Sequence, residues 1–120
     1  MALDRSEAGL TVLTISGEHD LSTAADLRRR LDQLISGGDP IVIDLSPATF
    51  VDSSVLGVIL DARRRAEAAG LGFAVTHEAN GNEAVARVLD ITGLRSQLPV
   101  HLEREEALSA ASAASERNSR

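Results

Sequence analysis

The segment Asp52-Ser53-Ser54 places a carboxylate beside two hydroxyls, at a point where a loop pattern changes into a helical pattern. Asp52 or Ser53 can cap this helix, so Ser53 and Ser54 belong to its first turn, where backbone N–H groups lack partners. A phosphate added there meets those donors and the positive end of the helix dipole. Its charge of about −1.5 to −2 then acts outward on a partner, through repulsion, bulk and desolvation. The segment therefore predicts either a phosphorylation switch or a plain helix cap.

The sequence lacks the residues that most classes of enzyme require for catalysis. All 12 basic residues are Arg and there is no Cys, which excludes lysine-dependent and thiol-dependent sites. Ser53 has no Gly-x-Ser-x-Gly surroundings, and Asp44 with Asp52 forms no complete phosphoacceptor or metal site. The three histidines, which are His19, His77 and His101, lack the spacing of a helical zinc pair. We expect no catalytic activity, no metal and no cofactor.

The apolar spacing predicts strands that alternate with helices. Strands are expected at 10–15, 41–45, 71–76 and 98–102. A first helix is capped by Ser22 or Thr23, carries the apolar stripe Leu27, Leu31, Leu34 and Ile35, and ends at Gly37-Gly38. Two further helices are expected, one that follows the cap at Asp52 or Ser53 and stops at Gly70, and one over 85–91 that closes at Gly93 after a turn at 80–82.

This order of elements predicts the fold class. Alternating strands and helices favour an α/β domain with a mixed, largely parallel sheet of four to five strands and helices packed on it. A chain of 120 residues with 43% hydrophobic content is the size of one domain, 1–120. We expect its core to cover about 10–102, with 103–120 forming a C-terminal helix or a flexible tail.

Charge and hydropathy narrow the possible partners. The net charge is −6, which disfavours nucleic acid and anionic membrane surfaces as partners. Two Arg triplets, 28–30 and 63–65, have acids nearby and are interpreted as solvated helix faces. The first ten residues carry acids and no apolar stretch, so we expect no signal peptide, and no run reaches membrane-spanning length. A cytoplasmic location is expected.

Three segments resemble those of the anti-sigma factor antagonists, which are bacterial STAS-domain proteins. They are Gly17-Glu18-His19-Asp20-Leu21, Ile43-Asp44-Leu45 and Phe50-Val51-Asp52-Ser53-Ser54-Val55-Leu56-Gly57, within a similarity over about residues 10–102. The resemblance implies a single STAS-like domain that regulates transcription by partner switching. In that family, the first hydroxyl after the aspartate is phosphorylated, and this position matches Ser53.

The resemblance also implies particular partners and contact residues. The unphosphorylated protein would bind an anti-sigma factor with serine kinase activity and so release a sigma factor, and a PP2C-type phosphatase would restore it after phosphorylation. The implied partner-binding residues are Asp20, Asp52, Ser53, Ser54, Val55 and Leu56. Asp20 has a second interpretation, as a turn acid that favours the start of the following helix.

Val55 departs from the family, which commonly has Gly after the two hydroxyls. As a side chain on the partner-facing turn, Val55 either fits a kinase with a matching hollow or reduces phosphorylation and leaves a constitutive binder. The alternative function is a non-switching STAS scaffold or ligand-binding module in a signalling assembly, in which Ser53 is only a cap.

Overall fold

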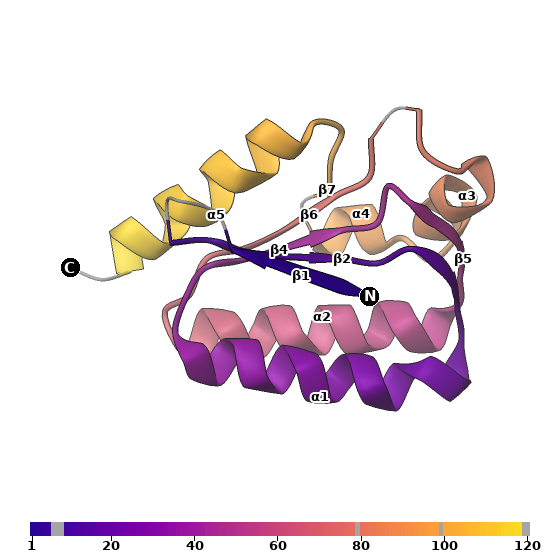
Figure 1. The fold of residues 1–120 in the computed structure, drawn as a ribbon. Helices are drawn as coiled ribbons and strands as arrows, with labels where there is room; N and C mark the ends of the chain where they lie inside the picture. Colours follow the sequence, from indigo (N-terminus) through magenta and orange to yellow (C-terminus); the bar gives the residue numbers. More distant parts are fainter. Residues whose placement is uncertain (6–8, 79, 99, 119–120) are drawn as a thin grey trace.

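The computed structural model describes residues 1–5, 9–78, 80–98 and 100–118. The fold is built on a five-stranded sheet (Figure 1). Its strands lie in the order β1 (Ala2–Arg5), β2 (Thr11–Thr14), β4 (Ile41–Asp44), β6 (Phe73–Thr76) and β7 (Val100–His101). β1 pairs antiparallel with β2, while the other neighbours are parallel. The predicted mixed, largely parallel sheet is confirmed.

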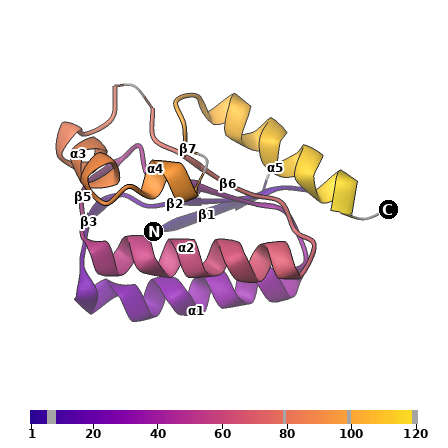
Figure 2. The ribbon, with the colours of Figure 1, turned by 180° about the vertical axis from the view of Figure 1, so that it is seen from behind.

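Helices cover both faces of this sheet, as the two opposite views show (Figures 1 and 2). α1 (Leu21–Gly37) and α2 (Ser53–Ala68) lie side by side on one face, and α5 (Arg104–Asn118) lies on the other. α3 (Glu83–Ile91) packs against the short strand β5 (Ala48–Val51), and α4 (Leu94–Gln97) follows it. No helix in the described ranges is long and apolar enough to cross a lipid bilayer.

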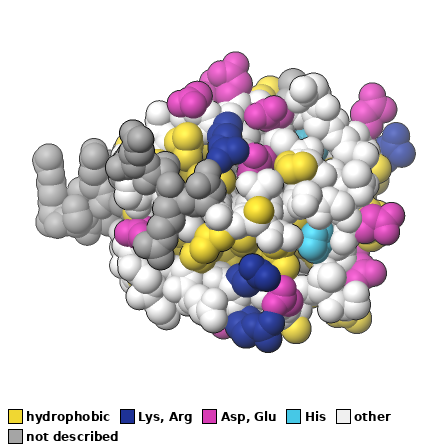
Figure 3. All heavy atoms as spheres, in the orientation of Figure 1, with side chains coloured by type: hydrophobic (Ala, Val, Ile, Leu, Met, Phe, Trp, Pro, Cys, Tyr) yellow, Lys and Arg dark blue, Asp and Glu magenta, His cyan; other side chains and the backbone are white. Residues whose placement is uncertain are grey.

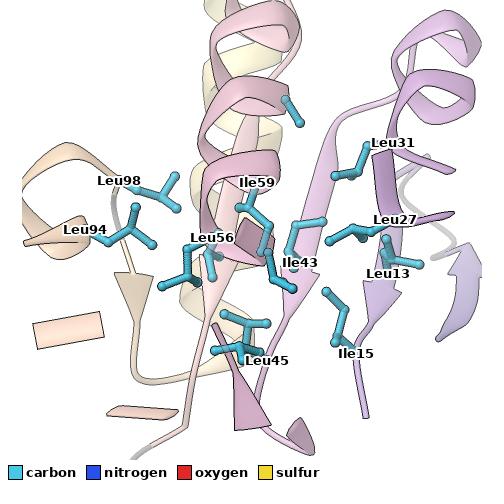
Figure 4. Close-up of a cluster of buried hydrophobic side chains, with 14 of the residues drawn as sticks. Leu13, Ile15, Leu27, Leu31, Ile43, Leu45, Leu56, Ile59, Leu94 and Leu98 are labelled. Carbon is cyan, nitrogen blue, oxygen red and sulfur yellow. The ribbon is translucent and has the colours of Figure 1, made fainter. Parts of the chain in front are cut away.

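The main core lies between the sheet and the α1–α2 layer (Figure 4). All four residues of β4 are buried, as expected for a central parallel strand. The predicted stripe on α1 turns Leu27 and Leu31 fully inward, with Leu34 and Ile35 at its half-buried margin. α2 contributes Val55, Leu56, Ile59, Ala62 and Ala66 at helical spacing. Small aliphatic side chains thus fill this core without tryptophan or tyrosine.

α5 extends the core beyond the expected limit at residue 102. Its residues Ala107 and Ala111 are fully buried on the second face of the sheet, against Val12 and Val42. A Cβ atom added at Gly72 would lie 1.8 Å from the carbonyl oxygen of Ala111, so the helix rests directly on the main chain of the sheet layer. The predicted tail helix is therefore present, and it is an integral layer of the domain.

A second, two-stranded sheet was not predicted. β3 (Gly17–His19) pairs parallel with β5, in a region that the sequence analysis read as loops. These strands have three and four residues and irregular burial, so the alternating pattern that identifies a strand is missing. Gly17, with a φ of +78°, turns the chain from β2 into β3. The short helix α4 was also missed.

Arginines of both triplets lie on solvated faces of α1 and α2 with acids nearby, as predicted, and several of them form ion pairs. Arg28 and Arg65 lie 3.2 Å and 3.0 Å from the carboxylate of Asp61, and Arg65 also contacts Asp32. These side chains are 37–57% exposed, so each pair contributes little to stability. On the face drawn in Figure 3, basic side chains are scattered among acidic ones, and they form no continuous basic surface there.

Candidate functional site

The start of α2 is organised by the side chain of Asp52. Its backbone is extended, and its carboxylate accepts hydrogen bonds from the N–H groups of Ser54 and Val55 at 3.0 Å and 3.1 Å. The Ser54 hydroxyl donates to the same oxygen at 2.5 Å. These bonds, led by that of the Ser54 hydroxyl, lower the pKa of Asp52 below its ordinary value. The predicted cap is thus confirmed, with Asp52 as the capping residue.

The two hydroxyls beside Asp52 differ in availability. Ser53 is exposed, and within the described part of the chain its hydroxyl makes no hydrogen bond. Ser54 is half-buried, and its hydroxyl is held by Asp52. A reagent approaching from solvent therefore meets the Ser53 hydroxyl as the accessible nucleophile of this turn.

Three of the N–H groups that the sequence analysis expected to lack partners at this helix start do have partners. Asp52 occupies those of Ser54 and Val55 through its carboxylate, and its carbonyl accepts from Leu56 at 3.2 Å. The carboxylate thus satisfies two of the donors that a phosphate was expected to meet. A phosphate on Ser53 would therefore be presented to solvent or to a partner.

The start of α1 repeats the same arrangement. Asp20 accepts from the Ser22 N–H at 2.9 Å and from the Ser22 hydroxyl at 2.5 Å, and these bonds lower its pKa. Thr23 completes a capping box by accepting from the Asp20 N–H at 3.2 Å. The N-cap is therefore Asp20 rather than Ser22 or Thr23, although Thr23 does accept a backbone N–H bond as the second member of the capping box.

The two helix starts are linked although they are far apart in the sequence. The backbone of Leu21 lies close enough to the carboxylate of Asp52 to act on its pKa, and the negative charge of Asp52 acts to raise the pKa of Asp20. The small sheet aligns them, because β3 leads into Asp20 and β5 leads into Asp52, with Glu18 opposite Phe50. The structure thus brings Asp20, Asp52, Ser53 and Ser54 into one surface.

Val55 and Leu56 lie on the opposite side of this helix turn. Val55 is fully buried and Leu56 is 2% exposed, since both side chains point into the main core. This burial corrects the expectation that Val55 adds a side chain to the partner-facing turn. In this conformation, neither side chain offers surface to a partner.

Three exposed residues near Ser53 were given no individual role in the sequence analysis. Leu21 is 75% exposed and Phe50 is 44% exposed, although both are large and apolar. Gly57 is exposed on α2, one helical turn after Ser53. Their signal in the sequence was weak: an apolar residue directly after a capping acid, and a glycine inside an amphipathic pattern.

Two other polar residues that the sequence analysis weighed, His19 and Asp44, have structural partners. His19 is 8% exposed, and its Nε2 and Nδ1 lie 2.9 Å from the Ser16 carbonyl and 3.1 Å from the Thr23 hydroxyl. Asp44 is 5% exposed, accepts from the Ser46 N–H at 2.9 Å and lies 3.6 Å from Arg104. Among the residues that the structure describes, no group of three or more His, Asp or Glu side chains is arranged to hold a metal ion.

Comparisons with known proteins find similarity over most of the chain. Residues 4–107 match the STAS domain family. The chain is 34% identical over 95 residues to the anti-sigma F factor antagonist of Paenibacillus polymyxa, covering 78% of this chain and 79% of that protein. An anti-sigma factor antagonist from Mycobacterium paratuberculosis superimposes with a TM-score of 0.76 at 26% identity, covering 92% of this chain and 91% of its own.

SpoIIAA, also an anti-sigma factor antagonist, has the same fold in its unphosphorylated form. Its TM-score is 0.70 at 23% identity, over 89% of this chain and 91% of that chain.

Proposed function

This chain belongs to the anti-sigma factor antagonists of the STAS domain family, and we propose that it binds an anti-sigma factor with serine kinase activity. Binding releases a sigma factor, and phosphorylation at Ser53 switches the binding off. A PP2C-type phosphatase restores the unphosphorylated protein. The chain itself acts by protein–protein contact in the cytoplasm and catalyses no reaction.

The observation that supports this proposal most directly is the contrast between Ser53 and its neighbour. Ser53 is exposed, with a hydroxyl that makes no hydrogen bond to the described residues, while the Ser54 hydroxyl is held by Asp52. A kinase needs its acceptor hydroxyl free to approach the γ-phosphate of ATP. Ser53 meets this requirement without any rearrangement of the helix start.

The surroundings of Ser53 explain how a phosphate would act on binding. Asp52 already takes the nearest N–H donors, and both Asp20 and Asp52 have lowered pKa values and are ionised at neutral pH. A phosphate on Ser53 therefore adds negative charge to a surface that already carries the two carboxylates of Asp20 and Asp52. A partner pressed against this surface must desolvate that charge and accommodate its bulk, which weakens the complex.

A phosphorylation experiment with a matched control tests the proposal. The protein is incubated with ATP and each candidate anti-sigma kinase from its own genome, and the products are mapped by peptide mass spectrometry. We expect one phosphate on Ser53 in the parent and in Ser54→Ala, and none in Ser53→Ala. Phosphate on Ser54 in the parent would contradict the assignment of the acceptor.

A binding measurement tests the switch itself. By calorimetry with the anti-sigma factor, Ser53→Ala should bind in the presence of ATP without being turned off, and Ser53→Asp should bind weakly. Equal affinity of Ser53→Asp and the parent would refute the charge mechanism. Binding by the parent without phosphorylation by any kinase would instead favour the alternative function, a non-switching STAS scaffold or ligand-binding module.

A further inference from the structure

Gly57 occupies an unfavourable position for a glycine. It lies inside α2, four residues after Ser53, and its backbone φ is not positive. Apart from proline, glycine is the least favourable residue in a helix interior, because it loses the most backbone freedom on folding. A glycine at this position therefore weakens the helix, and its presence needs an explanation in its small size.

Nothing inside the described part of the domain requires this small size. A Cβ atom built on Gly57 would have no heavy atom within 4 Å other than its local backbone neighbours, and the residue is exposed. Gly72 shows the opposite case, since a Cβ there would collide with the main chain of Ala111. Close packing within the fold thus explains Gly72 and leaves Gly57 unexplained.

The position of Gly57 relative to Ser53 indicates where its small size is used. Residues four apart on a helix lie on the same face, one turn from each other. Leu21 and Phe50, both exposed and apolar, lie near Asp52 at the same end of the domain, since the backbone of Leu21 is close enough to act on the pKa of Asp52 and Phe50 lies on β5, which leads into Asp52. Gly57 thus continues the surface that carries Ser53.

We propose that Gly57 is a close-contact residue of the partner surface, at which the main chain of the anti-sigma factor lies directly against the backbone of α2. This inference rests on the proposed function and adds to it a residue that determines specificity. A side chain at position 57 would hold the two main chains apart and would lift the partner off Ser53 as well. Gly57 then sets the distance at which the bound kinase meets its acceptor hydroxyl.

Substitution at Gly57 separates stability from binding, because the two should change in opposite directions. Gly57→Ala should raise the thermal unfolding midpoint, since alanine favours the helix and the space is open. The same change should weaken binding to the anti-sigma factor by about tenfold or more, as overpacking at a contact does, and Gly57→Gln should weaken it further. Phosphorylation of Ser53 by that kinase should fall in parallel.

Gly37 provides a matched control. It is an exposed helical residue in the last turn of α1, far from the start of that helix, and a Cβ there also meets nothing within 4 Å. Gly37→Ala should leave the affinity and the phosphorylation rate unchanged. Loss of affinity in Gly37→Ala equal to that in Gly57→Ala would show a general effect and would overturn the inference.

The remaining outcomes distinguish this inference from the proposed function. If the parent binds an anti-sigma factor and Gly57→Ala and Gly57→Gln bind equally well, the inference fails while the proposed function stands. If no anti-sigma factor of the same genome binds the parent by calorimetry, the proposed function fails, and the role of Gly57 fails with it.

Discussion

Val55→Gly tests whether the side chain of Val55 contributes to the core or to recognition by the partner. The side chain is fully buried among α2 and the main sheet. Removing it loses about 2 kcal/mol of transfer free energy. The cavity and the lower helix propensity of glycine add about 1 kcal/mol, for a total near 3 kcal/mol. This is a large part of the 5–15 kcal/mol that stabilises a typical domain, but the variant should still fold.

The assay is urea unfolding followed by circular dichroism, with Val58→Gly as the control. Val58 lies on the same helix and is only half-buried, so the same substitution should cost roughly 1 kcal/mol there. A difference of less than about 1 kcal/mol between the two variants would refute the packing argument for Val55. At a temperature where the parent and Val55→Gly are both folded, the kinase should phosphorylate them at the same rate. A several-fold change in this rate would show that the kinase recognises the side chain of Val55.

Two further predictions follow from buried positions outside the candidate site. The pKa of His77 is lowered from 6.5 mainly by burial, with repulsion from Arg95 adding to it and Asp44 opposing it. The unfolded chain therefore takes up the proton first, so the free energy of unfolding should fall as the pH drops below 6.5, and His77→Gln should flatten that fall in urea titrations. Gly72→Ala should lower stability by about 2 kcal/mol or more, because the new Cβ displaces α5, and the same assay on Gly37→Ala should show no loss.

The larger elements were predictable because their patterns are long and regular. The stripe that includes Leu27 and Leu31 identified α1, the run from Ile41 identified β4, and Asp52 at the change of pattern identified the start of α2. Four candidate site residues, Asp20, Asp52, Ser53 and Ser54, do lie on one surface, as the resemblance to the family implied. Their roles as partner contacts stay predictions.

The parts that the sequence analysis missed depend on contacts between distant segments. β3 and β5 are too short to show a period, and they exist because they pair with each other. The side of the helix that Val55 faces follows from the exact start of α2, which a change of one residue would rotate by about 100 degrees. The proximity of Leu21 to Asp52 brings together two helix starts far apart in the sequence, so no local pattern predicts it.

The pairing of β3 with β5 has a consequence for the thermodynamics of association. Each strand runs directly into a capped helix, so the acids at both helix starts are fixed in one rigid unit before any encounter. A surface made of flexible loops must lose conformational entropy when it docks, and that loss subtracts from affinity. A surface held by paired strands, by the capping box of α1 and by the Asp52 cap of α2 loses little further conformational entropy when it docks. Most of the interaction free energy at this small surface is then available as affinity, and the addition of a single charged group can remove a large share of it.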